Sequence, residues 1–209
     1  MEKTDNKNAL VLKGRVVAEP KMVRDSSFYE FELAIERASG TIDKIMVIFD
    51  RAKFDESVFD MIRIGENIGI MGKIVVYYDF RGKNMRPKHN VRALATTIGT
   101  MEELPEYFNE VYIEGTLSRN PVLRTTPIME KQITDFVVTV ISSGHTNYVP
   151  CIAWGKAAKW MSKRKNGDFA SVVGRFQSRE YNKLLDDGTL EVRTAYDIST
   201  IRIETFDKE

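Results

Sequence analysis

The alternation of apolar and polar residues repeats about 100 residues further along the chain. The first strand-like segment reads NALVLKGRVVAEP at 8–20, and a second reads NEVYIEGTLSRNP at 109–121. Asn, Gly and Pro recur at an offset of 101, together with the apolar positions between them. A repeat of this length is too long for a solenoid unit and has the size of a small domain. The pattern therefore predicts two copies of one fold.

Each copy continues with the same order of elements. Period-2 alternation predicts further strands, and they correspond between the copies as 31–35 with 136–140, 45–49 with 149–154, 68–74 with 169–176, and 91–95 with 192–196. Apolar residues at helical spacing predict a helix after the third strand, within 52–64 and over 156–165. Each helix is expected to end near a glycine, Gly65 or Gly167.

Five strands with a helix between the third and fourth are the layout of the OB-fold, a Greek-key barrel. The sequence thus predicts an all-β chain of two tandem five-stranded OB-fold barrels, each with one short helix. We expect the first, more divergent domain over 1–100, a linker over 101–108 that contains Pro105, and the second domain over 109–209.

Charge and composition narrow the function classes. The formal net charge is +1, so binding to nucleic acid would depend on local placement of cations. The single cysteine, Cys151, excludes an internal disulfide and lies in an apolar run. The N-terminus has no secretory signal pattern, and no apolar run reaches the length of a membrane span. These features favour a cytoplasmic protein without a membrane partner.

The residues that carry chemistry do not point to an enzyme. The two histidines, His89 and His145, lie in loop-like polar contexts, and no cluster has the spacing of metal ligands. Cys151 has no plausible histidine partner on its strand, and no glycine-rich phosphate loop precedes a helix. We expect neither catalysis nor a cofactor.

The second copy resembles the OB domain of bacterial single-stranded DNA-binding proteins. The resemblance runs through 109–121, TNYVPCIAWGKAA at 146–158 and NGDFASVVGRFQSREY at 166–181. It implies non-enzymatic, largely sequence-independent binding of single-stranded DNA in replication, recombination or repair, encoded by a bacterium, a phage or a mobile element. Two OB-folds in one chain resemble the members that form homodimers with four OB domains.

The resemblance and the residues together give a candidate site in the second copy. Single strands are bound by aromatic faces for bases and cations for phosphates. Tyr148, Trp154 and Tyr181 stand at positions that match the family's stacking aromatics, and the first two lie six residues apart, on one face of a regular strand. The candidate phosphate contacts in this copy are Arg175, Arg179, Lys156 and Arg193.

The first copy matches the family less well. Phe49 takes the place of Trp154, Asp43 that of Tyr148, and Tyr77 that of Arg179. Its cations are concentrated in the predicted loop between the last two strands, 77–92. Aromatic and basic residues alternate there, which suits a single-strand-binding loop; the candidates are Phe80, Arg81, Lys83, Arg86, Lys88 and Arg92. The hypothesis is that the second copy stacks bases and the first supplies a basic loop.

Two other functions fit the same pattern. An OB-fold can serve as a protein-interaction or assembly module, with the polar hairpin predicted at 182–191 facing a partner. Binding of RNA is the other, because a stacking face does not by itself separate RNA from DNA.

Overall fold

A computed structural model describes residues 5–23, 26–79, 88–126, 130–185 and 187–206. Its first half contains β1 (Asn8–Val16), β2 (Lys21–Met22), β3 (Phe28–Glu36), β4 (Ile42–Asp50), η1 (Arg51–Lys53), α1 (Val58–Met61), β5 (Asn67–Asp79) and β6 (Lys88–Gly99). Its second half contains β7 (Phe108–Leu117), β8 (Val122–Thr125), β9 (Gln132–Ser142), β10 (His145–Trp154), α2 (Gly155–Met161), β11 (Phe169–Leu184) and β12 (Leu190–Phe206).

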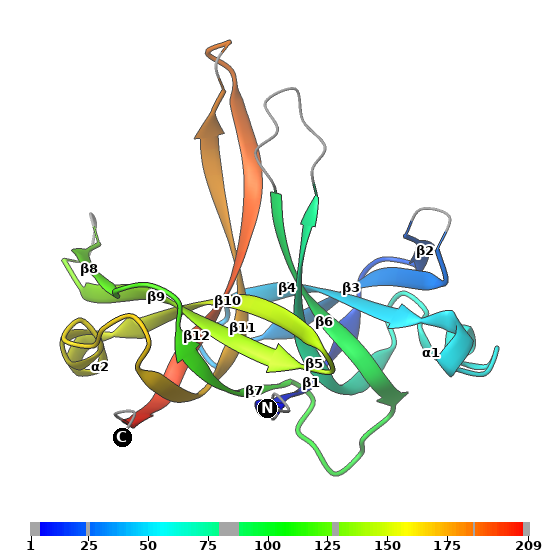
Figure 1. The fold of residues 1–209 in the computed structure, drawn as a ribbon. Coiled ribbons are helices and arrows are strands. Elements are labelled where there is room, and N and C mark those ends of the chain that lie inside the picture. The colour runs from blue at the N-terminus through cyan, green and yellow to red at the C-terminus, as the bar shows by residue number, and fades with distance from the viewer. Residues whose placement is uncertain (1–4, 24–25, 80–87, 127–129, 186, 207–209) are drawn as a thin grey trace.

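The predicted order of elements is confirmed in both halves, and each half closes into a barrel (Figure 1). Strands β4 and β6 pair in parallel, as do β10 and β12, while the other neighbouring strands are antiparallel. The end of β1 turns back to pair with β3, at Val16 opposite Leu33, and β7 pairs with β9 in the same way, at Leu117 opposite Val138. These pairings are the Greek-key closure of an OB-fold.

The element lengths differ from the predicted ones. The helix expected within 52–64 is reduced to η1 and the four-residue α1, and α2 ends at Met161 rather than at 165. Short strands β2 and β8 follow the prolines of the repeat, Pro20 and Pro121. The fourth and fifth strands of the second half are much longer than predicted, 16 residues in β11 and 17 in β12.

The long fourth and fifth strands of each half, β5 with β6 and β11 with β12, form two projecting hairpins, which we call the arms. In Figure 1 the β5–β6 arm and the β11–β12 arm rise side by side from the same side of the sheet. Their bases touch, because the Arg92 guanidinium of β6 lies 5.6 Å from the ring centre of Tyr196 in β12. The candidate residues Phe80, Arg81, Lys83 and Arg86 lie outside the described residues.

The two halves share one sheet. Antiparallel pairing of β1 with β7, with Leu10 opposite Val111, joins the halves, so the described strands form one 12-stranded sheet. The buried apolar side chains of both halves form one cluster. The sequence pattern showed two copies but not this pairing between them.

The repeated asparagine and glycine have the same structural role in each half. The side-chain amide of Asn8 donates to the Ile74 carbonyl and accepts from the Ile74 N–H at 2.8 and 2.9 Å. Asn109 bonds Phe176 in the same way, at 2.7 and 2.8 Å. Both contacts lie just beyond the last pair of the β1–β5 and β7–β11 ladders, so the asparagine side chains bond backbone groups that those ladders no longer reach. Gly14 and its counterpart Gly115 lie where a Cβ would collide with a neighbouring carbonyl.

One predicted correspondence between the copies is wrong by a single residue. The β3–β4 hairpin has Arg37 bonded to Thr41, with three residues between them, whereas the β9–β10 hairpin pairs Ser142 with His145, with two. The offset between the copies therefore drops from 105 before the turn to 104 after it. A shift of one residue moves every side chain of a strand to the opposite face.

The corrected register changes three assignments. Asp50, not Phe49, is the counterpart of Trp154; Lys44, not Asp43, is the counterpart of Tyr148; and Asp43 corresponds to Asn147. Phe49 is fully buried in an aromatic cluster with Tyr29, Phe31, Phe54 and Phe59. Phe49 is therefore a core residue, and its prediction as a base-stacking residue is wrong.

Candidate nucleic-acid interface

Trp154 lies at a groove between the two halves, which we call the Trp154 groove. This cavity of about 850 Å³ is lined by residues of both halves, among them Arg37, Lys44, Ile152, Trp154, Arg179 and Tyr196. Trp154 is the last residue of β10 and is 40% exposed. Its indole N–H donates to the Ser199 hydroxyl of β12 at 3.1 Å, which fixes the orientation of the ring.

A second groove lies beside the first, along the base of the arms. This cavity of about 750 Å³, the arm groove, is lined by Arg92, Arg179, Tyr181, Arg193 and other residues of both halves. Arg179 lines both grooves. Tyr181 is 41% exposed and pairs with Arg193 across the β11–β12 ladder. The arm groove therefore places an aromatic face and several guanidinium groups directly beside the Trp154 groove.

The structure thus gathers Trp154, Arg179, Tyr181, Arg193 and Arg92 along two adjoining grooves. Lys156 lines a shallower cavity of about 700 Å³ on the other side of Trp154, together with Lys131 and Lys159.

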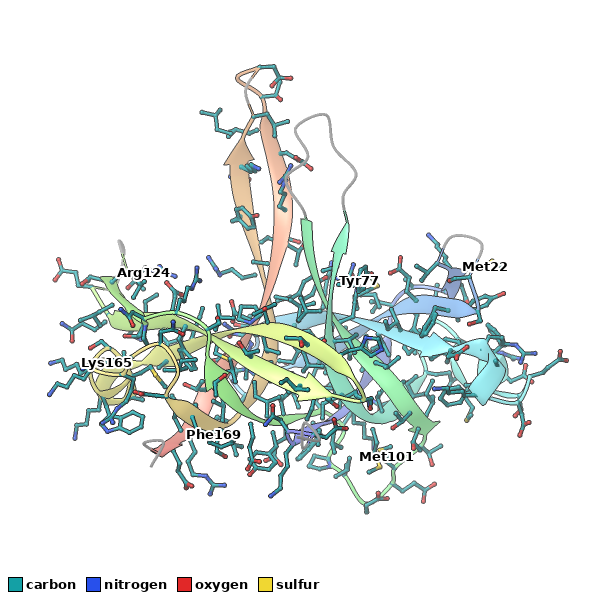
Figure 2. The ribbon with its side chains drawn as sticks, in the orientation of Figure 1. Met22, Tyr77, Met101, Arg124, Lys165 and Phe169 are labelled. Atoms are coloured by element: carbon teal, nitrogen blue, oxygen red, sulfur yellow. The ribbon has the colours of Figure 1, made fainter. Side chains whose placement is uncertain are left out.

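The remaining predicted aromatics and cations lie further from these grooves. Tyr148 is 40% exposed on the outward face of β10 that also carries Trp154, but it lines neither groove. Arg175 is half-buried, with its Nε 3.6 Å from Asp43. Tyr77, labelled at the base of the β5–β6 arm in Figure 2, lines a separate cavity that residues of both halves border. Lys88 begins β6.

Most of the groove arginines are held by carboxylates. Arg193 donates Nε and Nη2 to Glu191 at 2.9 and 2.7 Å, and this hydrogen bonding raises its pKa. Arg179 lies 4.0 Å from Asp197, and Arg92 lies 3.8 Å from Glu30. These pairs orient the guanidinium groups and explain how a binding groove coexists with a net charge near zero.

Several residues that line the grooves are not among those that the sequence predicts. Arg37 and Lys44 come from the first half, and Arg119, Arg124 and Tyr196 come from the second. Arg124 of β8, labelled in Figure 2, donates to Asp135. No local motif marks these residues, because each reaches its groove only through long-range strand pairing. The unexpected acid at Asp43 was the one sequence feature that could have pointed to these groove residues.

Asp197 is a buried carboxylate that lines the arm groove, and burial raises its pKa to about 6. The Gln177 amide, which donates to it at 2.6 Å, and the nearby Arg179 oppose this shift. A raised pKa in the folded state means that ionisation destabilises the fold. The associated stability is present at low pH and is lost as the pH rises from about 4 through 6.

Replacing Asp197 by Asn keeps an acceptor for Gln177 but removes the titration. We expect Asp197→Asn to match the wild type near pH 4 and to be more stable at pH 7.5, by up to about 3 kcal/mol for a shift of roughly two pKa units. Urea unfolding at the two pH values measures this difference. The exposed Asp60→Asn variant is the control, and an equal response of both variants to pH would contradict the assignment.

The described residues contain no group of three or more His, Cys, Asp or Glu side chains placed to hold a metal ion. Among the same residues, no helix is long and apolar enough to cross a membrane. Cys151 is fully buried, and burial raises the pKa of its thiol well above the usual value, which disfavours the thiolate.

Comparisons with known proteins agree with this geometry. Residues 108–205 match the model of the single-strand binding protein family. A single-stranded DNA-binding protein of Clostridium tetani is 32% identical over 91 residues, which cover 39% of this chain and 59% of that protein. This chain therefore spans less than two thirds of the length of that relative.

Two solved structures show the same fold over nearly the whole chain. The wild-type single-stranded DNA binding protein from Thermus aquaticus has a TM-score of 0.72 at 21% identity, covering 99% of this chain and 96% of that one. A deletion variant of the same protein has a TM-score of 0.70 at 22% identity, with coverage of 99% and 98%. The two-barrel architecture is thus shared, although the sequences have diverged. Residues 108–205 are thus similar to the single-strand binding protein family, and the chain as a whole has the fold of the two Thermus aquaticus structures, with two OB-folds.

Proposed function

We propose that this protein binds single-stranded DNA, largely independently of sequence, and catalyses no reaction. The observation that carries the proposal is the exposed Trp154 ring, hydrogen-bonded through one edge and bordered by cations on two sides. Bases stack on Trp154 and Tyr181, and Tyr148 extends the stacking face. Arg179, Arg193, Arg92 and Lys156 contact phosphates. Such a site suits replication, recombination or repair, in which single strands are transiently exposed.

Removing the Trp154 ring tests the proposal. Stacking on an aromatic side chain contributes roughly 1–3 kcal/mol per base, so Trp154→Ala is expected to raise the Kd for oligo(dT) about 5- to 150-fold. The slope of log K against log salt should stay nearly constant, because no phosphate contact is lost. The anisotropy of a labelled oligonucleotide measures both quantities without relying on tryptophan fluorescence.

The control is Trp160→Phe. Trp160 packs partly against the core, and the Arg164 guanidinium lies 4.4 Å from its ring centre, away from the grooves. This variant should bind as the wild type does. Absence of wild-type binding at low salt would refute the proposed function, whereas full affinity of Trp154→Ala would refute only the site. Stronger binding to oligo(U) than to oligo(dT) would favour an RNA ligand.

A protein-interaction module is the second candidate, and the end of the β11–β12 arm favours it. Leu184, Leu190 and Val192 are each more than 60% exposed there, with Leu184 directly opposite Leu190. Exposed apolar side chains gathered at one place on a surface are typical of protein-interaction sites. A chain that fails to bind single strands but self-associates through this arm would fit the second candidate.

Three organisational features belong to the same proposal. We place one domain over 1–100 and the other over 109–209, with 101–108 as the linker; residues 100–107 contain no helix or strand. A homodimer with four OB domains and a cytoplasmic location are supported by the resemblance to the family, and size-exclusion chromatography with light scattering tests the dimer.

A further inference from the structure

We propose that the two halves complete each other's binding grooves, and that the β3–β4 hairpin of the first half supplies phosphate-binding cations to the Trp154 groove. This inference rests on the proposed binding of single strands and assigns a role to two residues, Arg37 and Lys44, that the family resemblance does not cover. A strand bound on Trp154 would thus contact both halves at once.

The first argument is the attachment of β4 to β11. Asp43 in β4 is fully buried, and its carboxylate accepts a hydrogen bond from the Ser178 N–H of β11 at 3.0 Å. The next residue reinforces the contact, since the Lys44 N–H donates to the Ser178 hydroxyl at 2.8 Å. These two bonds fix the first half's hairpin against the strand that carries Arg179.

The second argument is the placement of Arg37. Its Nε donates to Asp43 Oδ2 at 2.7 Å, its Nη2 donates to Asp43 Oδ1, and Nη2 also lies 3.4 Å from Gln177 Oε1. Hydrogen bonding to Asp43 raises the Arg37 pKa. The guanidinium is held at the wall of the groove with donors left over, because it has five N–H groups. Asp43 is therefore a positioning residue.

The third argument is that the other half repeats the arrangement. Asn147, the counterpart of Asp43, accepts from the Val76 N–H of β5 at 2.8 Å. The Lys73 ammonium donates to the Ser143 hydroxyl at 2.7 Å. These residues border a cavity of about 580 Å³, at the place equivalent to the Trp154 groove, with Asp50 where that groove has Trp154. In both halves, the hairpin of the second and third strands thus bonds to the fourth strand of the other half. Of these two equivalent grooves, only the Trp154 groove has an indole.

Lys44 is the first-half residue best suited to contact a phosphate. Its side chain is exposed and lines the Trp154 groove. No carboxylate within the described residues lies within salt-bridge distance of its ammonium, whereas the Arg37 charge is balanced by Asp43. An unbalanced cation releases counterions when it binds a phosphate, so its loss should appear in the salt dependence.

The test compares Lys44→Gln with the wild type in oligo(dT) binding at several salt concentrations. Loss of one phosphate contact should make the slope of log K against log salt shallower by about 0.7 and weaken binding about 5-fold at 0.1 M salt. Lys44→Arg should restore both values. The control is Lys21→Gln, an exposed first-half lysine on β2 that lines none of the grooves described above.

The outcomes separate this inference from the proposed function. If Lys44→Gln has the same slope and affinity as Lys21→Gln, the first half does not complete the Trp154 groove and the inference is overturned. If the wild type does not bind oligo(dT), the proposed function itself fails. Because Lys44 is exposed, both lysine variants should unfold at the same urea concentration as the wild type, which excludes a merely structural effect.

Discussion

Arg37→Met is expected to lower the free energy of unfolding by about 3 kcal/mol, with a reduced urea midpoint. Asp43 is fully buried, and Arg37 donates to both of its carboxylate oxygens. Removing one partner of a buried ion pair typically costs 3–5 kcal/mol, because the other charge stays behind without compensation. We expect the lower end of this range, since Arg175 remains 3.6 Å from the carboxylate.

Two further variants show whether the buried charge is the cause. Arg15→Met breaks the exposed pair with Glu106, at 3.4 Å, and should cost less than about 1 kcal/mol. The double variant Arg37→Met with Asp43→Asn should recover most of the lost stability. Asparagine already stands at the equivalent Asn147, where it makes the same kind of backbone hydrogen bond. A double variant no more stable than Arg37→Met alone would contradict this explanation.

Gly115→Ala is expected to destabilise the protein by about 3 kcal/mol. A Cβ at this position would lie 2.0 Å from the Thr139 carbonyl oxygen of β9, and backbone atoms cannot move away as a side-chain end can. Overpacking in a closed core typically costs 1–3 kcal/mol, and a collision with backbone belongs at the upper end. Thermal and urea unfolding measure the loss, and Gly14→Ala should behave alike because its Cβ would meet the Ala34 carbonyl at 2.4 Å.

Gly99→Ala is the matched control for these substitutions. It lies at the end of β6, has no positive φ, and a Cβ there would have no atom within 4 Å. The free energy of unfolding of the Gly99→Ala variant should be unchanged or increase by about 0.4–1 kcal/mol, because alanine restricts the unfolded chain. A cost for Gly115→Ala as small as the change at Gly99 would show that close approach of the strands is not the reason for the repeated glycine.

Much of the fold was predictable because its signals are local. Alternating apolar residues, the recurring Asn–Gly pair and the glycines at Gly65 and Gly167 each report on their own strand or turn. The two glycines have φ values of 95° and 93°, and their N–H groups bond Val16 and Leu117 respectively. The lengths of the arms were not predictable, since β11 beyond Gln177 is exposed on both faces and loses the alternating pattern.

The candidate site was predictable only in part. Trp154, Tyr181 and Arg179 were predicted from a resemblance to a family. Trp154 lines one groove, Tyr181 lines the other, and Arg179 lines both. The prediction for Phe49 is wrong because the two hairpin turns differ by one residue, and no residue pattern in the turns marks that difference. A single-residue change of register converts a groove position into a core position.

The sequence by itself determined that two similar barrels exist, because the side-chain pattern of each strand must match its buried face. Only the tertiary structure decided how the barrels use each other. The β1–β7 pairing, and the contacts of Asp43 with Ser178 and of Asn147 with Val76, join residues at least 70 positions apart. Such contacts leave no local pattern, because their hydrogen bonds depend on where the backbone of the other half lies. The Trp154 groove is therefore a property of the assembled chain rather than of either repeat.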